Sequence, residues 1–100
     1  MNKIKAGIVG GAGYTGGELI RILLNHPGVV LNFIHSTSNA GKLISSVHPD
    51  LLGDTDLQFA SALQDDVDVL FLCVGHGDAK KFLEVNEKQL ETNYIIIQND

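Results

Sequence analysis

The feature that most constrains the fold is a glycine-rich segment directly after a short apolar run. Gly11-Ala12-Gly13-Tyr14-Thr15-Gly16 follows a strand candidate, Ile4 to Val9, and opens a helix candidate, Tyr14 to His26. A Gly-x-Gly-x-x-Gly motif between a strand and a helix is typical of dinucleotide-binding proteins. Its glycines permit a tight turn, close approach of the backbone to a pyrophosphate and close packing of the helix on the sheet. The motif predicts these cofactor-binding residues: Gly11, Gly13, Tyr14, Thr15 and Gly16.

The rest of the chain alternates between apolar runs and one further segment with helical period. Strand candidates are Val29 to His35, a short Leu57 to Ala60, Val67 to Val74 and Tyr94 to Ile97, and Asp78 to Leu90 has helical period. Continuous apolar runs are expected of parallel strands covered on both faces. The pattern predicts a Rossmann-like, doubly wound parallel α/β sheet.

The chain ends at Asp100, three residues after the fifth strand candidate and without a helix to cover that strand. We therefore expect a sheet truncated after its fifth strand. On this expectation, residues 1–100 are a partial N-terminal dinucleotide-binding domain, and the substrate and catalytic domain lies outside the chain.

Charge and cysteine content exclude several classes of partner. Lys plus Arg number 7 against 12 Asp plus Glu, a formal net charge of -5, which argues against nucleic acid and against an anionic membrane surface. No apolar run approaches the roughly 20 residues that a membrane span needs, and the N-terminus does not resemble a secretory signal. A single cysteine, Cys73, fits a reducing compartment, so a cytoplasmic location is expected.

The loop after the second strand candidate predicts which dinucleotide binds. A site for NAD usually has an acid about 20 residues beyond the glycine motif, where it accepts a hydrogen bond from the ribose 2′-hydroxyl. No acid lies between Val29 and Ala40, and the loop instead offers Ser36, Thr37 and Ser38. Hydroxyl groups donate to a 2′-phosphate, and Lys42 adds positive charge. We therefore predict NADP as the cofactor, bound through Ser36 and Ser38.

Other reactive residues carry weaker signals. His76 follows the strand candidate Val67 to Val74, at the edge where ligands of open α/β sheets bind, and we expect it to face the cofactor ribose or a substrate phosphate. The four histidines lack the spacing of metal ligands, so no metal site is expected. Cys73 lies within the strand pattern and is expected to be a buried, unreactive thiol. The chain thus contains no predicted catalytic residue.

Three blocks resemble the N-acetyl-γ-glutamyl-phosphate reductase family in order and spacing: Ala6 to Leu19, Ser38 to Lys42, and Val47 to Gly53. The likeness spans nearly the whole chain but only the N-terminal third of that family. It implies an NADPH-dependent reduction of an acyl phosphate, N-acetyl-glutamyl phosphate, to its semialdehyde in arginine biosynthesis. It also implies a homo-oligomeric full-length protein.

The resemblance implies that catalysis uses residues beyond this chain. The family's nucleophilic cysteine lies in a Gly-Cys-x-Pro-Thr-like segment after the cofactor domain, and its catalytic histidine comes later still. Cys73 is followed by Val74-Gly75 and does not match that segment, so the chain alone is expected to be inactive. Two positions depart from the family pattern, because Thr37 stands where Arg is frequent and Gly75 where Pro is common.

Other readings remain open at this point. A sugar-nucleotide epimerase also begins with a Gly-Gly-Ala-Gly-Tyr segment, but it needs an acid after the second strand and a Tyr-x-x-x-Lys pair, and both are missing. Aspartate-semialdehyde dehydrogenase shares the chemistry, although the Val47-His48-Pro49 block favours the glutamyl-phosphate enzyme. A stand-alone NADP-binding sensor is disfavoured by the uncovered last strand.

Overall fold

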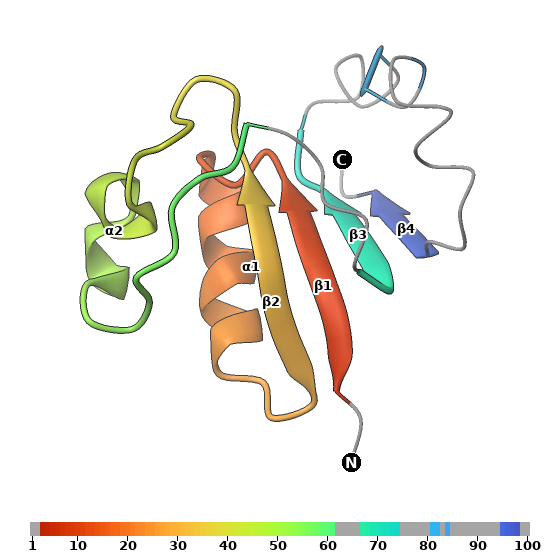
Figure 1. Cartoon of the computed structure of the whole chain (residues 1–100), viewed down its shortest axis with the longest axis horizontal. Helices are drawn as coiled ribbons and strands as arrows, with labels where there is room; N and C mark the ends of the chain where they lie inside the picture. The colour runs from red at the N-terminus through yellow and green to blue at the C-terminus, as the bar shows by residue number, and fades with distance from the viewer. Residues whose placement is uncertain (1–2, 62–66, 75–80, 83, 85–94, 99–100) are drawn as a thin grey trace.

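A computed structural model describes residues 3–61, 67–74, 81–82, 84 and 95–98. In these ranges the strands form one 4-stranded parallel sheet with the order β2-β1-β3-β4 (Figure 1). The sheet confirms the predicted Rossmann-like α/β architecture. In chain order the elements are β1 (Ile4–Val9), α1 (Tyr14–Leu24), β2 (Val29–His35), α2 (Ile44–Val47), the 3-10 turn η1 (Pro49–Leu51), β3 (Val69–Leu72) and β4 (Ile95–Gln98).

The strand order places a change of winding direction beside β1. The chain passes from β1 through α1 to β2 on one side, and β3 then pairs with the other side of β1. In open α/β sheets, ligands bind outside the carboxyl ends of the strands at such a switch point. The glycine-rich turn follows the carboxyl end of β1, so the fold places the predicted motif at the expected edge.

Helix α1 forms because its apolar residues recur every three or four positions. Gly16, Ile20 and Leu23 are its buried residues. It ends at Leu24, two residues before the predicted end, because Asn25 caps it and Pro27 disfavours helix in the residue before it. The Asn25 side-chain amide donates to the Arg21 carbonyl at 2.9 Å. Within the described ranges, no helix is long and apolar enough to cross a membrane.

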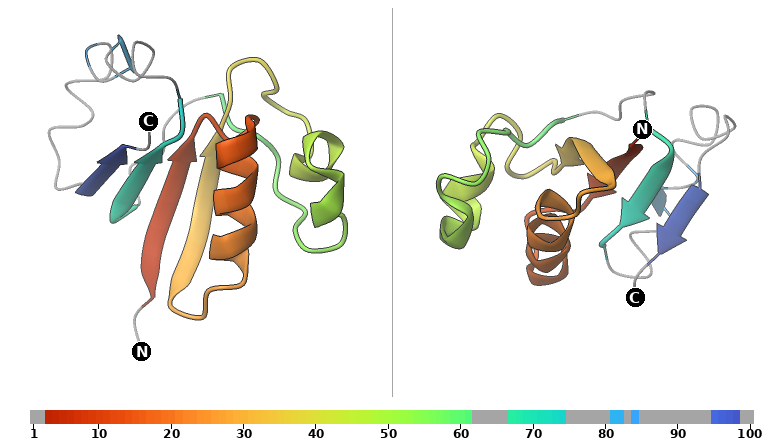
Figure 2. Two further views of the ribbon diagram at one scale, coloured as in Figure 1. Left: turned by 180° about the vertical axis from the view of Figure 1, so that it is seen from behind. Right: turned by 90° about the horizontal axis from the view of Figure 1, so that it is seen from below.

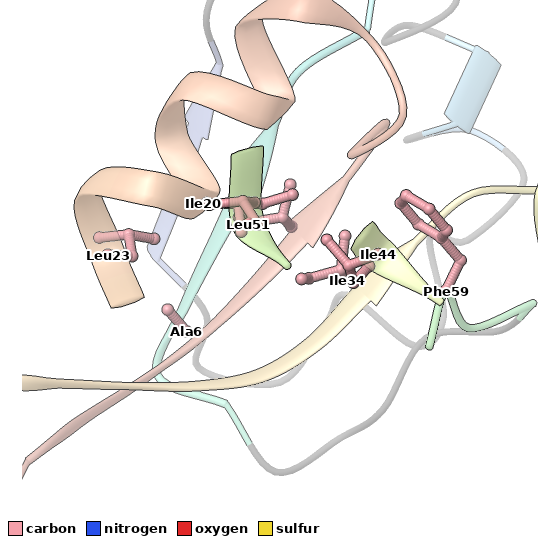
Figure 3. Close-up of a cluster of buried hydrophobic side chains, with 8 residues drawn as sticks. Ala6, Ile20, Leu23, Ile34, Ile44, Leu51 and Phe59 are labelled. Carbon is pink, nitrogen blue, oxygen red and sulfur yellow. The ribbon is translucent and has the colours of Figure 1, made fainter. Parts of the chain in front are cut away.

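Apolar side chains are buried on both faces of the sheet. Helix α1 covers one face (Figure 2, left), and the cluster beneath it is shown in Figure 3: Ala6, Ile8, Ile20, Leu23, Ile34, Ile44, Leu51 and Phe59. The opposite face buries Val9, Phe33, Val67, Leu70 and Leu72, with Val74 and Phe82 packed against them. Neighbouring residues of a strand thus serve opposite faces, as the pleat requires.

One predicted strand is shorter in the structure, and another does not form. Strand β3 is shorter than Val67 to Val74, although Asp68 N–H still donates to the Lys5 carbonyl at 2.7 Å and Cys73 N–H to the Val9 carbonyl at 2.8 Å. Leu57 to Ala60 forms no strand, so the described sheet has four strands and not five. Its residues make isolated bridges in two directions, Gln58 antiparallel to Leu43 and Ala60 parallel to His35, which prevents a continuous ladder.

The predicted C-terminal elements are described only in part. Lys81, Phe82 and Glu84 are helical, as the prediction for Asp78 to Leu90 requires, and the other residues of that segment lie outside the described ranges. Strand β4 begins and ends one residue later than the predicted Tyr94 to Ile97.

Candidate functional site

The glycine-rich turn is tied to the end of β2 through one carbonyl oxygen. The backbone N–H groups of Gly10 and Gly11 both donate to the His35 carbonyl, at 3.0 and 3.2 Å. Gly10 has a φ of 84°, a conformation that residues with a Cβ rarely adopt. The chain therefore reverses sharply after β1 and returns to start α1.

Gly16 allows α1 to begin directly against this turn. A Cβ on Gly16 would lie 2.6 Å from the Gly10 carbonyl oxygen and 2.7 Å from the Gly11 Cα. Both neighbours are backbone atoms, which cannot move aside as a side chain can. The third glycine of the motif thus has the packing role that the sequence predicted for it.

Gly13 has a different environment from Gly16. It caps α1 with a φ of -78° and a ψ of 174°, which any residue adopts, and a Cβ there would meet nothing within 4 Å. Tyr14 and Thr15 are exposed beside it. Neither backbone strain nor packing within the described residues requires a glycine at position 13. This turn offers open backbone at the start of a helix, where free N–H groups favour anions.

A cleft of about 420 Å³ lies between the turn and the loop after β2. Ser36 and Ser38, which the sequence predicts to bind the cofactor, both line it, but Ser36 is buried whereas Thr37 and Ser38 are exposed. Among the described residues, no acidic side chain lines it. The lining residues are Val9, Gly10, His35, Ser36, Thr37, Ser38, Val74 and Phe82.

Lys42 folds back toward the same loop. Its Nζ donates to the Asn39 side-chain oxygen at 3.4 Å, and the Asn39 amide donates to the Ser36 Oγ at 3.5 Å. A backbone hydrogen bond from Lys42 N–H to the Asn39 carbonyl, at 3.0 Å, closes the turn. The loop therefore combines hydroxyl groups with a cation and lacks a carboxylate.

Burial favours the neutral form of His35 at the edge of the cleft. Its partial burial lowers the pKa of the imidazole below the ordinary value of 6.5, and a hydrogen bond with the Ser61 backbone opposes this effect. The ring packs against Phe82 with centroids 6.1 Å apart. A neutral imidazole adds no charge to the cleft.

The lowered pKa of His35 predicts acid sensitivity. The unfolded chain binds this proton more readily than the folded chain, so the stability that depends on neutral His35 is complete above pH 6.5 and falls as the pH drops through the window below it. Denaturant unfolding of wild type and His35→Gln between pH 5 and 8 measures this slope. The glutamine variant should lose part of the slope, and identical slopes would contradict the assignment.

The remaining predicted residues have separate outcomes. Cys73 is partly buried, and desolvation raises the pKa of its thiol, which favours the unreactive protonated form. His76 lies outside the described residues. Within the described ranges no three His, Cys, Asp or Glu side chains form a group able to hold a metal ion.

Sequence reasoning missed one contact at this site. His48, between α2 and η1, hydrogen-bonds through Nε2 to the Gly11 carbonyl at 2.7 Å. The two residues are 37 positions apart, so no local pattern could pair them. The sequence offers one indirect signal: His48 belongs to the block Val47-His48-Pro49, which supports the family resemblance but gives His48 no role.

Comparisons with known proteins find relatives over nearly the whole chain. Residues 5–99 match the family model described as semialdehyde dehydrogenase, NAD binding domain. The chain is 62% identical over 98 residues to N-acetyl-gamma-glutamyl-phosphate reductase of Bacteroides thetaiotaomicron and 54% identical over 97 residues to that of Christiangramia forsetii. Each alignment covers 97% of this chain and 30% of the relative, so the chain spans about a third of those proteins.

Two solved structures share the fold. A Candida albicans aspartate semialdehyde dehydrogenase with NADP has a TM-score of 0.78 at 19% identity, covering 98% of this chain and 30% of that one. A dipicolinate-bound dihydrodipicolinate reductase from Paenisporosarcina has a TM-score of 0.68 at 16% identity, covering 98% and 37%. The sequence relatives carry the name of the predicted reductase, so the epimerase-like and sensor alternatives are not favoured.

Proposed function

Because the chain belongs to the semialdehyde dehydrogenase NAD-binding domain family, we propose that it is the cofactor-binding part of an N-acetyl-γ-glutamyl-phosphate reductase. This family binds a nicotinamide cofactor. We further propose that NADPH is the reductant and that N-acetyl-glutamyl phosphate is the substrate. Sequence relatives with this name support the substrate assignment.

The observation that carries the proposal is the environment of Gly13. A glycine that neither strain nor packing requires is accounted for by a ligand that approaches its backbone. Within the described residues, no backbone hydrogen bond outside the helices and strands uses the Ala12 N–H as donor. This group, with the exposed start of α1 at Tyr14 and Thr15, fits a pyrophosphate.

The chain's own residues bind and orient the cofactor in this proposal. The turn from Gly11 to Gly16 holds the pyrophosphate, and the loop of Ser36, Ser38 and Lys42 holds the adenosine end, with His76 placed toward the ribose or substrate. When bound, the nicotinamide supplies the hydride that converts the acyl phosphate to the aldehyde, with release of inorganic phosphate. The thiol and histidine that act on the substrate belong to the rest of the enzyme.

The reaction is tested in the reverse direction. The full-length enzyme should reduce NADP in the presence of N-acetylglutamate semialdehyde only when inorganic phosphate is added, because phosphate is the second product of the forward reaction. Residues 1–100 alone should show no turnover, because the catalytic thiol and histidine lie outside them. Absorbance of the reduced nicotinamide follows the turnover. Turnover of aspartate semialdehyde in place of this substrate would instead assign the chain to an aspartate-semialdehyde dehydrogenase.

The loop after β2 predicts a preference for NADP(H) over NAD(H). Hydrogen bonds to a charged partner are worth roughly 1.5–3 kcal/mol each, reduced by solvent at the rim of the cleft. We expect a preference of about tenfold to a hundredfold in affinity. Since Ser36 is buried and Ser38 is exposed, Ser38→Asp is the sharper variant, and its carboxylate should abolish or reverse the preference.

Titration of both cofactors into wild type and Ser38→Asp measures the ratio directly. Ser46→Asp is the matched control, because Ser46 is exposed on α2 and does not line the cleft. It adds the same charge and should leave the ratio unchanged. Equal wild-type affinity for NAD and NADP would show that this loop does not recognise the 2′-phosphate.

The proposal extends to the assembly and location of the enzyme. We expect a cytoplasmic homo-oligomer, as the resemblance and the single cysteine suggest. Light scattering of the purified protein tests the oligomeric state.

A further inference from the structure

The His48 side chain contacts both the glycine-rich turn and helix α1. Its Nε2 lies 2.7 Å from the Gly11 carbonyl oxygen. Its ring also lies over Gly17 in α1, where a Cβ would approach Cε1 to 2.5 Å and Nδ1 to 2.6 Å. Gly17 therefore provides the space that lets the imidazole reach the turn.

The backbone around His48 holds the ring in this place. His48 N–H donates to the Ile44 carbonyl at 2.9 Å and closes α2, and the His48 carbonyl accepts from Leu51 N–H at 2.9 Å and opens η1. The ring also packs against Phe59 at a centroid distance of 6.4 Å. The partly buried His48 side chain is thus held by backbone hydrogen bonds before and after it and by the Phe59 ring.

The hydrogen bond fixes the direction of one peptide group. A carbonyl oxygen only accepts, so the imidazole carries a proton on Nε2 and donates it. The peptide between Gly11 and Ala12 is planar and trans, and its C=O and N–H point in opposite directions. A carbonyl directed inward at His48 therefore directs the Ala12 N–H away from His48.

We infer that His48 is a positioning residue for cofactor binding: by holding the Gly11 carbonyl inward, it presents the Ala12 N–H to the pyrophosphate. This inference rests on the proposed function. His48 does not itself touch the cofactor. It acts through the peptide plane, and it links the segment of α2 and η1 to the phosphate-binding turn.

Two substitutions of His48 separate the effect of the hydrogen bond on cofactor binding from the effect of the ring's volume. Leucine fills comparable apolar space without a donor, whereas the glutamine amide retains one. His48→Leu should weaken NADPH binding about tenfold, and His48→Gln should recover most of that loss. Adenosine 2′-monophosphate, which has no pyrophosphate, should bind all three proteins within about twofold of one another.

His26→Leu is the matched control. His26 also makes a hydrogen bond to backbone, accepting from Gly28 N–H at 2.9 Å, but it lies beyond the opposite end of α1. This variant should bind NADPH like wild type. Equal losses for NADPH and adenosine 2′-monophosphate in His48→Leu, or no rescue by glutamine, would overturn the positioning role in favour of a purely structural one.

Gly17→Ala tests the same contact if His48→Leu does not fold. Alanine favours a helix over glycine by about 1 kcal/mol, so the variant supports α1 while its methyl group displaces the ring. We expect the same selective loss of NADPH affinity. Wild-type affinity for NADPH in Gly17→Ala would overturn the inference.

A measurement on the free protein separates this inference from the proposed function. The ¹⁵N shifts of His48 should show a protonated Nε2, and a scalar coupling across the hydrogen bond should join Nε2 to the Gly11 carbonyl carbon. Failure of wild type to bind NADPH would overturn the proposed function. A deprotonated Nε2 in the free protein would overturn the role of His48 whatever the ligand.

Discussion

Replacing Gly13 by alanine should weaken NADPH binding by about tenfold, and by valine about a hundredfold, with little change in stability. The added Cβ has no neighbour within 4 Å and the backbone conformation suits any residue, so the fold tolerates it. We expect the free energy of unfolding to stay within roughly 0.5 kcal/mol of wild type for alanine. The affinity falls because the methyl group occupies the space that the pyrophosphate needs.

Fluorescence titration with NADPH and denaturant unfolding measure the two effects of this change. Adenosine 2′-monophosphate is the control ligand, since it lacks the pyrophosphate and should bind wild type and Gly13→Ala equally. Unchanged NADPH affinity in Gly13→Val would remove the main support for a pyrophosphate at this turn.

Gly16→Ala should give the opposite pattern, with a loss of stability of about 2–3 kcal/mol. Its Cβ would meet the Gly10 carbonyl oxygen at 2.6 Å and the Gly11 Cα at 2.7 Å, and relief requires α1 to move away from the sheet. The better helix propensity of alanine, worth about 1 kcal/mol, does not compensate for this overlap. Binding of every adenine-containing ligand should weaken as the turn distorts.

Denaturant unfolding of Gly16→Ala beside Gly13→Ala checks this prediction, because the two variants make the same chemical change three positions apart in one motif. A stability of Gly16→Ala equal to wild type would show that the helix does not need this close approach. Equal destabilisation of both variants would show that the turn is uniformly packed, contrary to the open surroundings of Gly13.

Elements with a local periodicity could be predicted from the sequence. Strands β1 and β2 match their predicted bounds because both are rich in apolar residues and glycine or proline adjoins one end of each, Gly10 after β1 and Pro27-Gly28 before β2. Helix α1 was predicted two residues too long at its end because helical period alone does not locate a cap. Helix α2 escaped prediction because four residues with one buried side chain, Ile44, carry no period to detect.

Features that depend on contacts between distant segments could not be predicted. The motif predicted a packing role for Gly16, but only the structure identifies the atoms that a Cβ there would meet, the Gly10 carbonyl oxygen and the Gly11 Cα. Ser36 and Ser38 look equivalent in sequence, yet Ser36 is buried where its N–H donates to the Ala60 carbonyl at 3.0 Å. The pairing of His48 with Gly11 is of the same kind, since nothing near either residue indicates the other.

The shared acceptor at His35 has a consequence for how such a site can change through evolution or design. In the proposed function, the turn that holds the pyrophosphate and the loop that holds the adenosine end are joined by main-chain hydrogen bonds, from the Gly10 and Gly11 N–H groups to the His35 carbonyl. Main-chain bonds do not depend on side-chain identity. The exposed residues 37 and 38 can therefore mutate, and so change the dinucleotide preference, without loosening the main-chain hydrogen bonds that hold the phosphate turn. Cofactor specificity can thus change at the side chains while the hydrogen bonds from Gly10 and Gly11 to the His35 carbonyl stay in place.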